Sequence, residues 1–212
     1  KKRFKGEFVW KTIYEKEISS NDDFAIEFYD RLNPAHVDVE YAYVPVIAGS
    51  DSNTNIVSAS VYSEFKDDIL CERDVAYPLI LDADNTLTYN RESNTIVSPG
   101  RKYPYIVNNG IAQYYSGTYT VTFIELKDCR WDTEKAYAYR NQLDQFLANG
   151  KAKILKTTEG DIWMINVVGS ISRSNDGPYH VTQSFDWAEA GNPTSIADLY
   201  DNGFIDTDVD RE

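Results

Sequence analysis

The chain has few cysteines and histidines and is short of basic charge, and each shortage argues against a class of protein. Its 212 residues include 2 Cys, 2 His and 1 Met. Two cysteines cannot make the disulfide framework of a small secreted domain. An unpaired, buried thiol is the commoner state and a bridge between Cys71 and Cys129 is the alternative, so the redox compartment stays open.

Basic side chains are outnumbered by acidic ones. The 34 Asp and Glu against 21 Lys and Arg give a formal charge of −13, which repels a phosphate backbone and an anionic lipid surface. We therefore expect no nucleic acid and no membrane as partners. No apolar run approaches the roughly 20 residues that span a bilayer. The chain starts without Met and, by its strand pattern, partway into a domain, which indicates a portion of a longer protein.

Aromatic residues are abundant and favour strands. The chain has 16 Tyr, 9 Phe and 4 Trp, and aromatic side chains pack well on a pleated sheet. At this length we expect two domains. Apolar and polar residues alternate in the first third, which predicts strands with one buried face. These predicted strands are 8–14, 24–29, 37–46 and 56–62.

Residues 1–63 are therefore predicted to form a β-sandwich of immunoglobulin or fibronectin type, or part of one. The run Val39–Val46, with the Gly-Ser loop and the strand after it, resembles the last two strands of a fibronectin type III domain. The charged stretch 64–73 is interpreted as the passage to a second domain, 64–206. Residues 207–212 are expected to be a frayed acidic tail.

In the second domain the pattern changes from strand to helix and back. An acidic capping region, apolar residues at helical spacing and an exit glycine, Gly150, predict a helix over about 132–149. Strands are expected on both sides of it. They are 76–81, 87–90, 105–107 and 117–126 before the helix, and 152–156, 162–168 and 180–187 after it. The whole is mainly β with one dependable helix.

No segment has the pattern of a catalytic or metal site. The loop 51–55 opens like an EF-hand calcium loop but has Ile56 where Gly is needed and Tyr62 where Glu is needed, so a polar hairpin loop is the better interpretation. The alternate carboxylates Asp206, Asp208 and Asp210 are better explained as a solvated end than as a cation site.

The two histidines lie in different predicted domains, and neither has a second ligand at the spacing of a zinc site. His36 and His180 are therefore not expected to bind zinc. A Cys129–His180 nucleophilic pair has no local sequence signature. We expect no enzyme activity, no cofactor and no metal.

Two exposed-aromatic candidates remain for binding. Tyr114 with Tyr115, like Tyr103-Pro104-Tyr105, would form a sugar-stacking face, although strand aromatics are more often core residues.

The helix and the strands after it carry a family resemblance. The run Tyr139–Val167, then His180–Gly191 and Asp198–Asp206, with the upstream Pro99–Gly110, resembles tail proteins of bacteriophages that infect Gram-positive bacteria. Its layout is similar to the ring-forming domain of distal tail proteins. The resemblance covers roughly residues 60–206. It implies a β-barrel or split barrel with one helix, assembled into a ring in a phage tail or baseplate.

The resemblance makes a virion tail structural protein the leading hypothesis, homo-oligomeric and in contact with other tail proteins. The expected assembly residues lie on the helix and the final strands: Tyr139, Leu143, Phe146, Trp163, Phe185 and Trp187. A module that binds host cell-wall carbohydrate is the alternative, and a glycoside hydrolase is the third. The oligomer number, the contacted tail proteins and direct host binding stay open.

Overall fold

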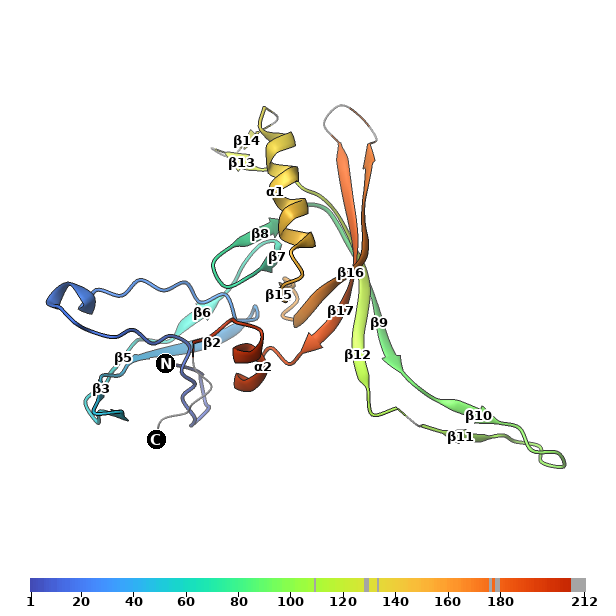
Figure 1. Ribbon diagram of the computed structural model, residues 1–212, viewed down its shortest axis with the longest axis horizontal. Helices are drawn as coiled ribbons and strands as arrows, with labels where there is room; N and C mark the ends of the chain where they lie inside the picture. The colour runs from blue at the N-terminus through green and yellow to red at the C-terminus, as the bar shows by residue number, and fades with distance from the viewer. Residues whose placement is uncertain (109, 128–129, 133, 176, 178–179, 207–212) are drawn as a thin grey trace. The chain divides into compact units, whose positions relative to one another are not determined.

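The computed structural model describes residues 1–108, 110–127, 130–132, 134–175, 177 and 180–206 (Figure 1). Cys129 and the tail 207–212 lie outside the described residues, and so do the predictions made for them. The chain divides into two compact units. Unit 1 comprises residues 1–79, 151–165 and 190–212, and unit 2 comprises 80–150 and 166–189. This division is discontinuous, whereas the predicted division at residue 63 cuts the chain once. The predicted domain boundary stays a prediction.

The fold is mainly β, as predicted. Most described elements are strands; the helices are η1 (Asn21–Phe24), α1 (Ala136–Ala148) and α2 (Ile196–Asp201). The largest sheet ends in two different edge strands, so the described residues form an open sheet and no closed barrel. Its strands, in order across the sheet, are β8 (Ala76–Leu79), β7 (Asp68–Cys71), β15 (Lys153–Lys156), β16 (Ile162–Asn175), β17 (Val181–Gly191), β12 (Gln113–Thr122) and β9 (Leu81–Arg91). No helix in the described part of the chain is long and apolar enough to cross a membrane.

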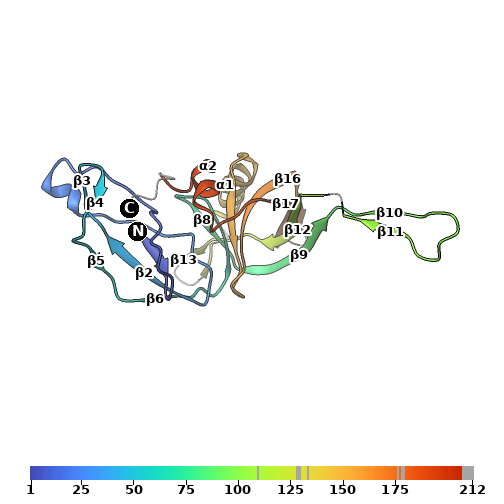
Figure 2. The ribbon, with the colours of Figure 1, turned by 90° about the horizontal axis from the view of Figure 1, so that it is seen from below.

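Residues 1–63 form one small sheet and a ribbon. The central strand β2 (Val37–Tyr43) pairs antiparallel with β1 (Lys2–Phe4), β5 (Ile56–Val57) and β6 (Val61–Ser63), while β3 (Val46–Ile47) and β4 (Ser50–Asp51) form the ribbon (Figure 2). The predictions for 37–46 and 56–62 are confirmed in part, because each contains paired strands.

Two predicted strands are absent. Within residues 8–14 only Lys11 makes an isolated bridge, to Lys2, and residues 24–29 hold the end of η1 followed by irregular chain. Both segments alternate apolar and polar residues, but a strand also needs a partner for its backbone groups. Several of their apolar side chains are exposed, and Phe8 is 94% and Phe24 58% accessible, whereas Ile13 is buried.

The core of unit 1 draws on distant parts of the chain. Strand β7 (Asp68–Cys71) pairs with β8 (Ala76–Leu79) on one side and with β15 (Lys153–Lys156) on the other. It lies inside the charged stretch 64–73, so part of that stretch belongs to the sheet. Strand β15 also pairs with the start of β16 (Ile162–Asn175). The buried apolar cluster of this unit is Leu32, Cys71, Ala152, Ile154, Met164, Leu199, Phe204 and Ile205.

Unit 2 is built on two long strands and α1. Strand β12 (Gln113–Thr122) pairs with β9 (Leu81–Arg91) and with β17 (Val181–Gly191), and β13 (Leu126–Lys127) pairs with β14 (Arg130–Trp131). The predicted helix is confirmed, but it begins at Ala136, because Asp132 caps the preceding turn: its Oδ1 accepts from the backbone N–H of Glu134 and Lys135, each at 3.1 Å.

The helix α1 is held to the strands of unit 2 by polar contacts as well as by its apolar face. Its Asp144 accepts hydrogen bonds from Arg173 of β16 and from the fully buried Gln183 of β17. Arg173 also donates to the backbone oxygen of Arg140 at 3.0 Å. Leu143, Phe146 and Leu147 are buried. The helix is therefore an integral part of this unit.

Candidate assembly surface

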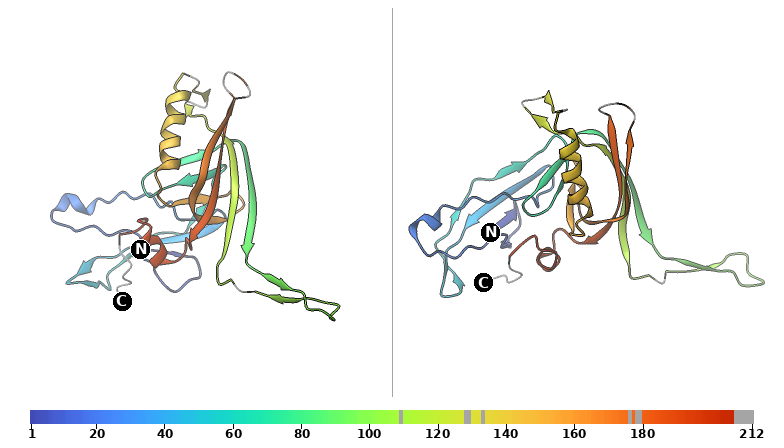
Figure 3. Two further views of the ribbon diagram at one scale, coloured as in Figure 1. Left: turned by 45° about the vertical axis from the view of Figure 1, so that its right-hand side comes forward. Right: turned by 45° about the horizontal axis from the view of Figure 1, so that its top comes forward.

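The most exposed apolar feature of unit 2 is a β-hairpin inserted between β9 and β12. We call residues 92–108 the arm; it contains β10 (Asn94–Ile96) and β11 (Tyr105–Val107), which pair antiparallel. Beyond the last β9–β12 pair, Arg91 with Gln113, the chain leaves the larger sheet. Figures 1 and 3 show the arm projecting from the end of these two strands.

A tight turn shapes the tip of the arm. The backbone N–H of Arg101 donates to the carbonyl oxygen of Ser98 at 3.3 Å, with Pro99 and Gly100 between them. Gly100 has φ +86°. Proline at the second position and a positive-φ glycine at the third are what a type II turn requires. The sequence therefore fixes this turn locally.

Both faces of the arm are exposed and apolar. On β11, Tyr105 is 52% and Ile106 is 70% accessible, and successive strand residues point to opposite faces. Ile96, which lies opposite Tyr105, and Val97 are exposed too. Among the described residues, β10 and β11 pair only with each other, so their outer edges are open. A lone two-stranded ribbon is marginally stable in water, and exposed apolar surface of this kind marks interaction sites.

Tyr114 and Tyr115 do not form one sugar-stacking face. They are neighbours on β12, so their side chains point to opposite faces of the sheet. Tyr115 lies opposite Tyr89 of β9, with ring centroids 4.9 Å apart and planes tilted by 47°. A sugar ring stacks on an exposed aromatic face. Because Tyr114 and Tyr115 point to opposite faces of the sheet, they give weak support to carbohydrate binding.

The side chains predicted for assembly are mostly core residues. Leu143, Phe146, Trp163, Phe185 and Trp187 are all buried within the chain, and Tyr139 is half-buried. A side chain that fills the core of its own chain has little surface left for a second subunit. The assembly role of this set stays a prediction, and exposed residues offer more surface for contact with another subunit.

Of the arm's residues, only Tyr103 and Tyr105 were site candidates, for sugar stacking. The arm was missed as an assembly surface, although its sequence held a signal. Thr95-Ile96-Val97 and Tyr105-Ile106-Val107 are two β-forming runs on either side of a Pro-Gly turn, a pattern typical of a hairpin. What the pattern does not reveal is whether a partner strand or helix covers the hairpin. Its exposure became visible only in the structure.

Unit 1 holds a buried polar cluster that has the residue types of an active site. The Lys2 ammonium donates to both Asp30 carboxylate oxygens, at 3.1 and 3.0 Å, and to Asn33 Oδ1 at 2.9 Å. Tyr41 donates to Asp30 and accepts from Asn33. Burial lowers the pKa of Lys2, opposed by Asp30, and burial together with Asp30 raises the pKa of Tyr41. Because these polar groups satisfy one another, we interpret the cluster as structural.

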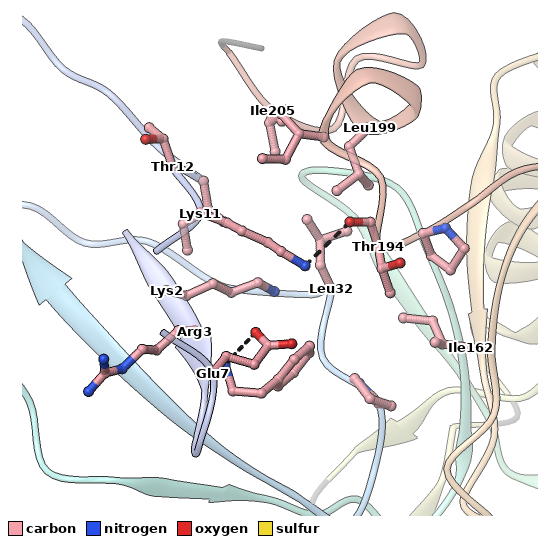
Figure 4. Close-up of a pocket in the computed structure, with 15 residues that line it drawn as sticks. Lys2, Arg3, Glu7, Lys11, Thr12, Leu32, Ile162, Thr194, Leu199 and Ile205 are labelled. Carbon is pink, nitrogen blue, oxygen red and sulfur yellow. Dashed lines mark hydrogen bonds between the residues drawn. The ribbon is translucent and has the colours of Figure 1, made fainter. Parts of the chain in front are cut away.

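The apolar cavity of unit 1 in Figure 4 is too small for a substrate. Its volume is about 70 Å³, and Leu32, Ile162, Leu199 and Ile205 contribute to its lining. Typical ligand pockets measure roughly 300–1,000 Å³. The polar contact across it, from Lys11 Nζ to the Thr194 carbonyl oxygen, is 3.5 Å long. This cavity is a packing gap in the core.

The remaining candidate site residues have structural partners. Asp51, first in the EF-hand-like loop, forms an ion pair with Lys1, and Asp206 pairs with Arg73 at 2.7 Å. His36 contacts Tyr62 Oη at 3.2 Å and the Thr158 carbonyl oxygen at 2.8 Å. Burial raises the pKa of the Cys71 thiol to about 11, which makes it a poor nucleophile. No group of three His, Cys, Asp or Glu residues in the described part of the chain is placed to hold a metal ion.

Comparison with known proteins gives a limited result. No protein-family model matches the chain, and no curated protein matches it. Among solved structures, the tail of an empty gene transfer agent particle with C6 symmetry is similar over 59% of this chain and 91% of that chain, at 10% identity and a TM-score of 0.39. The virion of a native gene transfer agent particle is similar over 59% and 92%, at 15% identity and a TM-score of 0.36. Such low scores carry no argument about fold or function.

Proposed function

We propose that the chain is a structural protein of a phage-type tail and that copies of it associate through the arm. The observation that carries the proposal is the arm itself: a two-stranded hairpin with exposed apolar side chains on both faces and open edges among the described residues. The sequence resemblance to tail proteins of phages that infect Gram-positive bacteria supports the same role. The virion tail is then the location, and other tail proteins are further partners.

The arm by itself has no core on which its apolar faces could pack, and this favours association with another subunit. An isolated ribbon gains little from burial, because neither face packs on a core. Contact with a second subunit would bury Ile96 on one face and Ile106 on the other. At roughly 1.5 kcal/mol or more for each buried side chain, the two together are worth about 3 kcal/mol of association. That corresponds to about a hundredfold in the dissociation constant.

The experiment compares the self-association of the chain with that of two double variants. Ile96→Asp with Ile106→Asp places one charge on each face of the arm; Val61→Asp with Val75→Asp adds the same charge at exposed valines of unit 1. Sedimentation velocity at micromolar concentration should show oligomers of the unmodified chain and of the valine variant. The arm variant should be monomeric, with unchanged circular dichroism. A monomeric unmodified chain at every concentration would refute the proposal.

Carbohydrate recognition is the second candidate from the sequence, and the structure offers it less support, because Tyr114 and Tyr115 face opposite sides of β12. Glycan-array binding that disappears in Tyr115→Ala would restore it. We make no proposal for hydrolysis.

A further inference from the structure

The tip of the arm is cationic in a strongly acidic chain. The arm has two basic residues, Arg101 and Lys102, against the single acid Glu92, whereas the whole chain has a charge of −13. The Arg101 guanidinium lies 4.1 Å from the centroid of the Tyr105 ring, and Lys102 Nζ lies 5.5 Å from that of Tyr103. The tip therefore presents positive charge together with aromatic surface.

A segment of unit 1 has the opposite character. Residues 15–29, which we call the acidic segment, contain five carboxylates and one lysine. That lysine, Lys16, already pairs with Asp23 at 3.0 Å. Phe24, Ile26 and Tyr29 are exposed beside the remaining charges. The acidic segment thus offers negative charge together with apolar surface.

An open groove runs beside the acidic segment. Its volume is about 900 Å³, and its lining includes Glu17, Ile18, Ile26 and Phe28 of the segment together with residues that follow β2, such as Val46. This is enough room for several side chains, since ligand sites of roughly 300–1,000 Å³ hold whole small molecules. The groove combines apolar side chains with the carboxylates of Glu15, Glu17 and Asp51, while the lysines that line it, Lys1 and Lys16, are paired with Asp51 and Asp23.

The backbone of the acidic segment is also available for pairing. Residues 26–29 alternate apolar and polar side chains like a strand, yet their backbone groups make no backbone hydrogen bond with any other described residue. Unpaired N–H and C=O groups in an extended segment are a template for a strand from another chain. The arm carries open strand edges of its own.

We propose that the tip of the arm of one copy docks in the groove of the acidic segment of a second copy. The inference rests on the proposed function, because it names the surface that receives the arm. Charge complementarity favours a second copy as the occupant: Arg101 and Lys102 meet Glu15 and Glu17 of the groove lining, and Tyr103 meets the apolar lining. Charge attraction would speed encounter and select the partner surface, while the apolar contacts hold the complex.

The test is a charge swap between two variants. Variant A carries Arg101→Glu and Lys102→Glu in the arm; variant B carries Glu15→Lys and Glu17→Lys in the groove lining of the acidic segment. In A alone an acidic tip meets an acidic groove, and in B alone a basic tip meets a basic groove. Each should self-associate at least about tenfold more weakly than the unmodified chain. Mixed in equal amounts, A and B should form oligomers again, because each tip then finds a groove of opposite charge.

A third variant controls for net charge. Lys66→Glu with Arg130→Glu changes the chain's charge by the same amount as variant A, at exposed residues outside both surfaces. It should associate like the unmodified chain in sedimentation velocity at low and high salt. If A and B stay monomeric when mixed while the unmodified chain assembles, the arm docks elsewhere; the inference fails and the proposed function stands. If the unmodified chain does not assemble, both fail.

Discussion

Removing Asp30 should destabilise the fold far more than removing a matched surface carboxylate. Asp30 accepts hydrogen bonds from the Lys2 ammonium, from Tyr41 at 3.0 Å and from the Leu32 backbone N–H at 2.9 Å. Its side chain is 5% accessible and that of Lys2 is 7% accessible. Asp30→Ala therefore leaves a buried ammonium whose only remaining acceptor in the cluster is Asn33. Asp30 also opposes the burial that lowers the pKa of Lys2.

The expected size follows from burial. Breaking a buried ion pair by removing one partner typically costs about 3–5 kcal/mol. The chain supplies its own control: Asp38 pairs with Lys5 at 3.4 Å, with side chains 40% and 59% accessible. Exposed pairs of this kind contribute roughly 0–1 kcal/mol. The two Asp→Ala variants should therefore differ by at least about 2 kcal/mol.

Urea unfolding followed by tryptophan fluorescence measures this difference. With an m-value of about 2 kcal/mol/M, Asp30→Ala should lower the midpoint by about 1.5 M or more, and Asp38→Ala by less than about 0.5 M. Asp30→Asn keeps the shape and an acceptor, so its midpoint should fall between the two. Equal midpoints for the Asp30 and Asp38 variants would refute the view that the Lys2–Asp30 pair is a buried structural contact.

Two further predictions concern one glycine and one cysteine. Gly117→Ala should lower the free energy of unfolding by about 3 kcal/mol or more, because the new Cβ would lie 2.0 Å from the Thr86 carbonyl oxygen of β9. The control Gly177→Ala, whose Cβ would have nothing within 4 Å, should change the thermal midpoint little. Similar midpoints for the two variants would contradict the β9–β12 register. Burial raises the pKa of Cys71 from 9.0 to about 11. The free energy of unfolding should therefore fall by up to about 3 kcal/mol as the pH rises from about 9 to 11, because the thiol ionises first in the unfolded chain. Urea titrations of the chain and of Cys71→Ala across this range check the sign, and parallel curves would refute it.

Local features of the fold were predictable from the sequence and features that depend on distant pairing were not. The helix α1 follows from residues within one stretch, so its existence was predicted and only its start was misplaced. The strand β7 lies in a charged stretch and is defined by its pairing with β15, which is more than 80 residues away in the chain. Residues 24–29 show the converse: they have a strand pattern but no partner.

The candidate site was harder to predict because burial is a property of the whole fold. Trp187 and Leu143 were chosen for assembly because they are large and apolar, and the same property places them in the core with no accessible surface. Ile106 has the same chemistry but is exposed, because the arm leaves the sheet after Arg91. Sequence alone does not distinguish a buried apolar side chain such as Trp187 from an exposed one such as Ile106, since both lie in strands with similar patterns.

The discontinuity of unit 1 has a consequence for synthesis on the ribosome. Residues 1–79 are made before unit 2, but β15 follows the arm, and the residues that complete the core, Leu199, Phe204 and Ile205, follow residues 166–189 of unit 2. Until then the edge of β7 that faces β15 stays unpaired and the apolar cluster is incomplete. The groove proposed to receive the arm belongs to this late-completed unit. A nascent chain would thus carry a finished arm before it offers a finished receptor for one, which delays self-association until Leu199, Phe204 and Ile205 have been made.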